Sequence, residues 1–302
     1  MTGVQTCALP IFSPDLAATC IQLYDDDGQL LWERPPFVKT TYPGDTAAAN
    51  RLQLLTYDPG GLLPFTDSSG RTYALSTVEA SVPVRRQILL WGADSIPLNV
   101  YLHTGSILAS YYNSMDWNGD GTPECFFAGT NNRFNRAALL VLNPFTMRGV
   151  SPPYDDPLFL ASGMERGNAL RYVAFPETPL SLTGPDTVIR NYVVDAKFDP
   201  VSHLVQVGVA EGCGWTLDSM SIDFNGTAPT ILYYLDSNFI PVSCAMQEAN
   251  SQRYNYYLSR LNRGTVTDFS TLYNELLRNT IVYYGDSIVH HPASGIDFYS
   301  HH

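Results

Sequence analysis

The stretch Asp116-Trp117-Asn118-Gly119-Asp120-Gly121-Thr122-Pro123-Glu124, continued by Cys125-Phe126-Phe127-Ala128-Gly129, decides the expected fold. Oxygen-bearing side chains stand at alternate positions 116, 118 and 120, and a carboxylate closes the loop at 124. Calcium takes about six to eight oxygen ligands and tolerates irregular geometry, while the two glycines allow the tight backbone that points such oxygens inward. Residues 124–129, which are apolar from Cys125 onward, favour a strand. The stretch therefore predicts a calcium-binding loop, here called the 116–124 loop, in front of a β-strand.

Short strand-like runs separated by turn residues continue on both sides of this stretch. Asp27-Gly28, between the runs 20–24 and 29–33, predicts a β-hairpin. The further runs are 52–57, 72–78, 87–91, 98–102, 106–110, 124–129, 137–142, 170–175, 188–196, 203–209, 215–223, 231–235 and 239–245. Many short antiparallel strands at this spacing indicate an all-β sandwich, barrel or propeller.

Internal repetition favours the propeller. Residues 219–235 repeat the outline of residues 114–129: a Ser-Met pair, a D-x-N-G turn and a strand. The second copy has Asp223 and Asn225 but no counterparts of Asp120 and Glu124, so we expect a plain hairpin turn there. Repeats of this length are typical of arrays whose units bury their faces on their neighbours.

The pattern changes near the C-terminus. In residues 252–261 and 269–277 apolar side chains recur with helical spacing, which predicts two amphipathic helices, the second with Asp268 as its N-cap. The runs 280–284 and 287–291 flank Gly285-Asp286 and predict a final hairpin. We expect propeller blades in 13–245 and a helical part with the final hairpin in 246–302, packed on the propeller or inserted in it.

The first residues stand apart from the rest. Met1 to Ile11 resemble the in-frame translation of a short-read sequencing adapter, typical of metagenomic data. We therefore expect residues 1–12 to be an artefactual, unstructured leader and the propeller to be a fragment truncated at its N-terminus. Of the remaining cysteines, Cys125 and Cys244 lie in apolar runs, which predicts buried reduced thiols, and the wide spacing disfavours a zinc site.

Composition narrows the classes of function. With 302 residues, 45% of them hydrophobic, the chain can bury a large core. The formal net charge of −12 disfavours nucleic-acid binding through a basic face. No stretch approaches the roughly 20 apolar residues of a membrane-spanning helix.

Residues 116–129, D-W-N-G-D-G-T-P-E-C-F-F-A-G, resemble the FG-GAP (integrin-α-like) group of β-propellers. Blades of that group carry D-x-[DN]-x-D-G-x-x-[DE] before an apolar strand that ends in glycine. The resemblance implies a structural calcium ion with this ligand set: Asp116, Asn118, Asp120 and Glu124 through side chains, and Thr122 through its backbone carbonyl. It covers one blade, with a degenerate echo at residues 223–226, and it implies a non-catalytic, extracytoplasmic binding module.

Other interpretations stay open at this point. The 116–124 loop also suits a metal-free turn, because Asp, Asn and Gly favour turns by themselves. A polysaccharide-active hydrolase or lyase could use acids such as Asp155, Asp156 or Glu165, and a third possibility is the sensor domain of a larger regulatory protein. The histidines at 290, 291, 301 and 302 do not predict a metal site. The first two are adjacent in a predicted strand and so point to opposite faces, and the last two lie at the chain end.

We therefore predict a non-catalytic, calcium-stabilised binding module, periplasmic or extracellular, with a protein or carbohydrate partner. Aromatic side chains that could stack on such a partner are Tyr111, Tyr112, Trp117, Tyr154 and Phe159. The alternative for these side chains is packing within the sheets. No nucleophile motif G-x-S-x-G and no phosphate-binding G-x-x-x-x-G-K-[ST] occurs in the sequence.

Overall fold

The computed structural model describes residues 21–24, 27–35, 38, 54–56, 62–67, 69–81, 84–93, 96–107, 113–154, 162–183, 187–199, 201–216 and 228–290. Strands dominate these residues, and two helices lie near the C-terminal end of the described chain. The all-β prediction with a small helical pair is confirmed, and the arrangement of the sheets as propeller blades stays a prediction. The chain divides into two compact units. The first takes the described residues up to Phe127 and from Val141 to Leu170, and the second takes the others.

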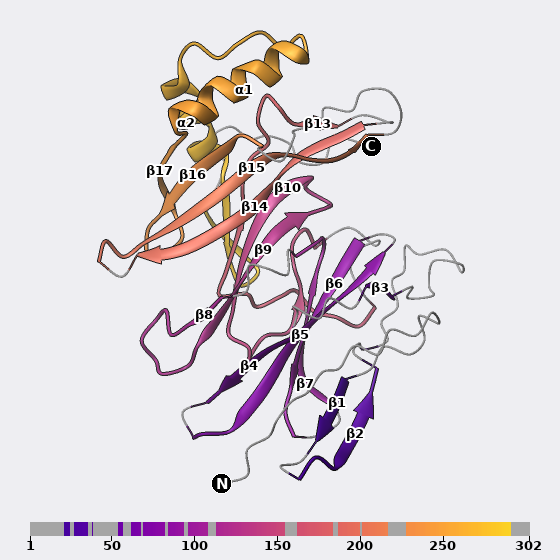
Figure 1. Cartoon of the computed structure of the whole chain (residues 1–302). Coiled ribbons are helices and arrows are strands. Elements are labelled where there is room, and N and C mark those ends of the chain that lie inside the picture. The colour runs from indigo at the N-terminus through magenta and orange to yellow at the C-terminus, as the bar shows by residue number, and fades with distance from the viewer. Residues whose placement is uncertain are drawn as a thin grey trace. The chain divides into compact units, whose positions relative to one another are not determined.

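The main sheet of the first unit has the strand order β11-β7-β6-β5-β3, with β4 also paired to β5 (Figure 1). Its strands are β3 (Leu54–Thr56), β4 (Leu62–Thr66), β5 (Thr72–Ser81), β6 (Val84–Trp91), β7 (Pro97–His103) and β11 (Gly149–Val150). The β11–β7 pair is parallel, and the other pairs of this sheet are antiparallel. Ile88, Leu89 and Leu90 follow one another in β6 and are all buried, so this strand is covered on both faces.

A two-stranded hairpin belongs to the same unit. It consists of β1 (Ile21–Tyr24) and β2 (Leu30–Arg34), which confirms the hairpin predicted from Asp27-Gly28. Gly28 has a φ of 76°, the left-handed conformation that such a turn requires. The ring of Trp32 lies 5.9 Å from that of Trp91, and its Nε1 donates a hydrogen bond to the carbonyl of Ala93. These contacts join the hairpin to the main sheet.

A second six-stranded sheet has the order β19-β18-β12-β10-β9-β8. Its strands are β8 (Asn113–Met115), β9 (Glu124–Asn131), β10 (Arg136–Leu142), β12 (Arg171–Ala174), β18 (Ile281–Tyr284) and β19 (Ser287–His290). The border between the two units crosses β9 and β10. Every residue of β9 is buried, which agrees with the apolar run 125–129 in its middle, and the polar Glu124, Thr130 and Asn131 at its ends are buried as well. The pairing of β18 with β19 confirms the predicted final hairpin.

The second unit contains a five-stranded antiparallel sheet, ordered β13-β14-β15-β16-β17. Its strands are β13 (Leu182–Thr183), β14 (Thr187–Asp199), β15 (Leu204–Thr216), β16 (Thr230–Leu235) and β17 (Pro241–Ala245). The break predicted between the strands 203–209 and 215–223 is wrong, because β15 runs without interruption to Thr216. Residues 217–223 lie outside the described residues. The pairing of β15 with β14 has two register shifts, one of them between Ala210 and Cys213, in the segment where the break was predicted. The Asp223 turn lies outside the described residues.

Two helices, α1 (Glu248–Arg260) and α2 (Phe269–Asn279), follow β17 (Figure 1). The carboxylate of Asp268 accepts hydrogen bonds from the backbone N–H groups of Ser270 and Thr271, which confirms the predicted N-cap. The Tyr273 hydroxyl accepts a hydrogen bond of 2.9 Å from the N–H of Met246, directly after β17. This contact fixes α2 to the end of the five-stranded sheet.

The interior of the second unit holds an acidic side chain. Glu211 of β15 has no exposure to solvent, and neither of its carboxylate oxygens has a hydrogen-bond partner among the described groups. The buried hydroxyls of Tyr233 and Tyr254 also lack one. Burial raises the pKa of Glu211 to about 8. The carboxyl group is therefore mostly protonated at neutral pH.

This burial predicts that the second unit loses stability as the pH rises. Glu211 ionises in the unfolded chain near its ordinary value of 4.5 but in the folded chain only near 8. Between these values the folded state binds the extra proton, so the free energy of unfolding falls with pH, by on the order of 5 kcal/mol in total. Glu211→Gln, which cannot ionise, flattens this part of the profile in thermal unfolding measured from pH 5 to pH 8.5.

The matched control is Glu275→Gln, an exposed acid on α2 of the same unit. We expect it to keep the wild-type profile. A Glu211→Gln protein with the same pH dependence as the wild type would contradict the assignment.

Candidate calcium loop and the adjoining hollow

The 116–124 loop joins β8 to β9, whose register places Met115 opposite Glu124. Gly119 and Gly121 have φ values of 75° and 83°, in the left-handed region. A Cβ atom at either position would meet no other atom within 4 Å. The loop therefore needs these glycines for their backbone conformation and not for space.

Side-chain oxygens of the loop accept hydrogen bonds from its own backbone. Asp116 Oδ2 accepts from the N–H of Gly121 at 3.0 Å, and Asp120 Oδ1 accepts from the N–H of Thr122 at 2.7 Å. Asn118 Oδ1 accepts from the N–H of Asp120 at 2.8 Å, and its Nδ2 donates to Asp120 Oδ2. The bond from Asn118, together with that from Thr122, lowers the pKa of Asp120. The loop is thus a series of Asx turns in which Asp116, Asn118 and Asp120 remain exposed.

Glu124 differs from these residues because its side chain is completely buried. Its Oε2 accepts a hydrogen bond of 2.7 Å from the N–H of Trp117, and its Oε1 has no partner among the described groups. Burial raises the pKa of Glu124, the Trp117 N–H lowers it, and the charges of Asp120 and Asp116 raise it further. A buried carboxylate oxygen without a donor costs free energy, about 1–3 kcal/mol or more.

The five predicted ligand positions therefore come together in one loop. Their donor set is oxygen only, from three carboxylates, one amide and a backbone carbonyl, and Glu124 Oε1 is unpartnered, so the chemistry of these groups is of the kind that calcium prefers. In the structure the Asp116, Asn118 and Asp120 side chains nevertheless accept hydrogen bonds from the loop backbone. Among the described residues, no three His, Cys, Asp or Glu side chains are grouped in position to hold a metal. Calcium binding would require Asn118 and Asp120 to exchange these bonds for the ion.

A hollow of about 300 Å³ adjoins the loop in the first unit. Three segments line it: the loop tip at residues 121–123, the β4–β5 turn, and the turn that follows β10. The lining residues of the last two segments are Asp67, Arg71, Tyr73, Asn143, Phe145 and Thr146. The rings of Tyr73 and Phe145 meet edge to face with centroids 5.0 Å apart, which gives the hollow an aromatic wall.

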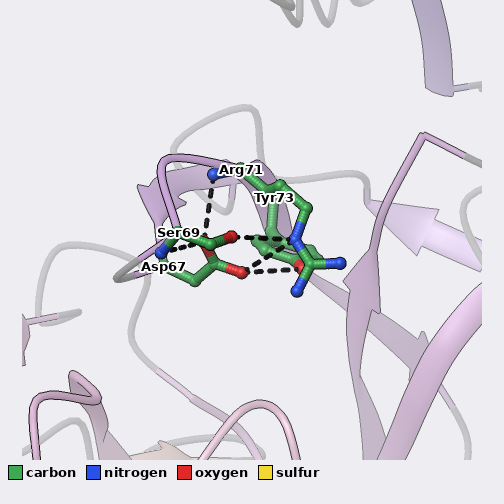
Figure 2. A network of polar contacts seen from close by, with 4 residues as sticks. All are labelled: Asp67, Ser69, Arg71 and Tyr73. Carbon is green, nitrogen blue, oxygen red and sulfur yellow. Dashed lines mark hydrogen bonds and ion pairs between the residues drawn. The ribbon is translucent and has the colours of Figure 1, made fainter.

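The β4–β5 turn is held by the carboxylate of Asp67 (Figure 2). Its Oδ1 accepts hydrogen bonds from the N–H and hydroxyl of Ser69 and from the N–H of Arg71. Its Oδ2 accepts from Arg71 Nε and from the Tyr73 hydroxyl, each at 3.1 Å. These bonds, that of the Ser69 hydroxyl first, hold the pKa of Asp67 well below its ordinary range. Asp67 is therefore a fixed structural anion and a poor proton carrier.

The other predicted residues lie apart from this hollow or outside the described chain. Glu165 is exposed and forms an ion pair with Arg148. The ring of Trp117 packs edge to face against Phe126, and the Tyr154 ring lies under the guanidinium of Arg166. The predicted residues outside the described chain are Tyr111, Tyr112, Asp155, Asp156, Phe159, Asp223, Asn225, His291, His301 and His302.

Both cysteines expected to be buried are buried free thiols. Burial raises the pKa of Cys125 and of Cys244 to about 12, so neither is a reactive thiolate at neutral pH.

Sequence reasoning missed the β4–β5 turn. The signal that could have revealed it is Asp67-x-Ser69-Gly70, a turn sequence in front of a strand-like run. This turn sequence was overlooked because the residues before it, Leu62–Thr66, contain a proline, which argues against a β-strand. Pro64 nevertheless pairs in β4, a strand outside the main path of its sheet.

No protein-family model and no curated protein matches the chain. No helix among the described residues is long and apolar enough to cross a membrane.

The hydrogen bonds of Asp67 predict an acid-sensitive turn. Because its pKa is lowered in the folded state, the carboxylate stabilises the protein above its ordinary value of 3.8, and this stabilisation decreases as the pH falls below that value. We expect Asp67→Asn to lower the melting temperature at pH 7, and the difference from the wild type to shrink below about pH 3.8. Ser69→Ala, which removes one donor to the same carboxylate, has a smaller effect. Equal melting temperatures at pH 7 would refute the role of Asp67.

Proposed function

We propose that the protein is a non-catalytic binding module whose 116–124 loop is stabilised by calcium and whose partner is a glycan. The observation that carries this proposal is Glu124, a fully buried carboxylate with one oxygen unpartnered, beside Asp116 and Asp120. A cation would supply the missing partner and offset three neighbouring negative charges. The resemblance of residues 116–129 to FG-GAP blades supports the same ligand set.

Asp116, Asn118, Asp120 and Glu124 would hold the ion through side chains and Thr122 through its carbonyl. When bound, calcium supplies charge neutralisation and a fixed loop shape and takes no part in a reaction. The loop tip at residues 121–123 lines the hollow. Fixing the loop would therefore fix one wall of the hollow, which connects the metal to the binding of a partner.

A binding role is favoured over a polysaccharide-active enzyme. Glycoside hydrolysis uses two carboxyl groups on either side of the scissile bond, one of them able to give up a proton. Asp67, the acid that lines the hollow, accepts five hydrogen bonds and is held in the ionised form. Glu165 lies in an exposed ion pair with Arg148. Among the described residues, neither Asp67 nor Glu165 has the surroundings expected of an acid in glycoside hydrolysis.

The net charge of −12 favours a partner other than nucleic acid. The FG-GAP resemblance favours an arrangement of the sheets as propeller blades and a periplasmic or extracellular location, where calcium is abundant enough to fill weak sites.

Calcium is expected to raise the stability of the native protein. Because the ion binds the folded loop and not the unfolded chain, a free concentration about 100 times the Kd adds about 2.7 kcal/mol to the free energy of unfolding. Thermal unfolding with excess calcium and with EGTA measures this. Glu124→Gln keeps the shape of the side chain but removes its charge, so its calcium-dependent shift is small or absent.

Without calcium, we expect Glu124→Gln to be as stable as the wild type or more so, because it no longer buries a charge. Glu165→Gln, which changes an exposed acid in the same unit, keeps the full shift. The same melting temperature with calcium and with EGTA in the wild type would rule out the metal.

A further inference from the structure

We infer that the hollow beside the 116–124 loop is a subsite for a uronic acid, a sugar unit that carries a carboxylate. The inference rests on the proposed function, since it names the class of glycan that the same site binds. It is carried by the hydrogen-bonding groups of the lining, by the aromatic wall and by the charges around them.

The side chains of Asp67, Arg71 and Asn143 leave hydrogen-bond donors, and no carboxylate acceptor, available to a ligand. Both oxygens of Asp67 are already occupied by donors of its own turn. Arg71 uses its Nε for Asp67 and Ser69 (Figure 2), whereas its two terminal nitrogens have no partner among the described residues. Asn143 Oδ1 accepts from the N–H of Phe145, so its amide NH₂ remains to donate. A ligand that complements these groups is rich in acceptors.

Arg71 points to a carboxylate in particular. Its side chain is 74% exposed although its Nε is fixed, so the terminal nitrogens are held in one orientation and open to a ligand. The planar fork of a guanidinium matches the two oxygens of a carboxylate. Fixing the Nε beforehand also reduces the entropy that Arg71 loses when a ligand binds.

The shape of the hollow favours a ring over a small inorganic anion. A volume of about 300 Å³ is at the lower end for small-molecule sites and much larger than a sulfate or phosphate needs. Tyr73 and Phe145 form an aromatic wall, and Pro123 adds apolar surface. The C–H face of a pyranose ring can pack on such a wall while its carboxylate meets Arg71 and its hydroxyls meet Asn143 and Thr146.

The charge of the neighbouring loop makes binding depend on calcium. Asp116 and Asp120 are exposed in the loop whose tip lines the hollow, and they repel an approaching carboxylate. A calcium ion in the loop removes this repulsion. We therefore expect affinity for the uronic acid to fall when calcium is withdrawn.

Isothermal titration calorimetry of the full chain with galacturonic acid trisaccharide tests the inference. Galactose trisaccharide is the neutral match, and an acidic peptide of three glutamates is the non-sugar carboxylate. In calcium we expect the uronate to bind at least about tenfold more tightly than either competitor, and EGTA to weaken it. Equal affinity for the neutral sugar, or tighter binding of the peptide, would overturn the inference.

Variants of Arg71 give a second readout. Arg71→Gln loses the preference for the uronate over galactose, and Arg71→Lys keeps part of it, because lysine retains the charge but lacks the fork. Arg148→Gln, an exposed arginine of the same unit outside the hollow, keeps the full preference. If Arg71→Gln does not fold, the Arg71→Lys variant and the wild-type selectivity decide the matter.

The two proposals fail in different ways. A calcium-dependent melting shift without uronate binding overturns the subsite and leaves the calcium loop standing. Uronate binding that is selective but the same in calcium and EGTA, with no melting shift, overturns the metal and the calcium dependence while the Arg71 subsite stands.

Discussion

Glu124 carries a carboxylate into the interior at the first residue of β9, and the loop before it depends on how that charge is satisfied. The N–H of Trp117 donates to one oxygen, and the other oxygen has no partner among the described groups. An ionised carboxylate is costly to bury unless it is paired. A proton or a cation can satisfy it, and the raised pKa shows that burial favours the proton when no cation is present. The stability of the loop is therefore set by competition between these two partners.

Asp67 shows the opposite arrangement on a neighbouring turn. Five hydrogen bonds converge on its carboxylate, so it is stable as an anion without a cation. Its function is to hold the β4–β5 turn and, through Arg71 Nε, to orient a guanidinium. Two acids that look alike in sequence thus have different roles, because one has its donors supplied by its own turn and the other lies at a buried strand end with one oxygen unpartnered.

Short sequence patterns correctly predicted the elements whose conformation depends on interactions between neighbouring residues. The Asp27-Gly28 and Gly285-Asp286 hairpins and the Asp268 N-cap follow from turn and capping rules that involve a few consecutive residues. The break predicted between residues 209 and 215 was wrong because pairing with β14 outweighs the weak strand preference of two glycines. The hollow could not be predicted, since its lining comes from segments near residues 70, 122 and 145 that only long-range packing brings together.

The loop and the hollow share residues 121–123, and this sharing determines how they influence each other. The N–H of Thr122 donates a hydrogen bond to Asp120 Oδ1. A cation bound by the Asp120 carboxylate would therefore weaken or replace the hydrogen bond that positions Thr122. Coupling can therefore arise by charge neutralisation or by displacement of the wall. By thermodynamic linkage, whatever factor calcium adds to ligand affinity, the ligand adds to calcium affinity. Salt separates the two routes: screening weakens coupling between exposed charges, whereas displacement of a wall is nearly independent of ionic strength.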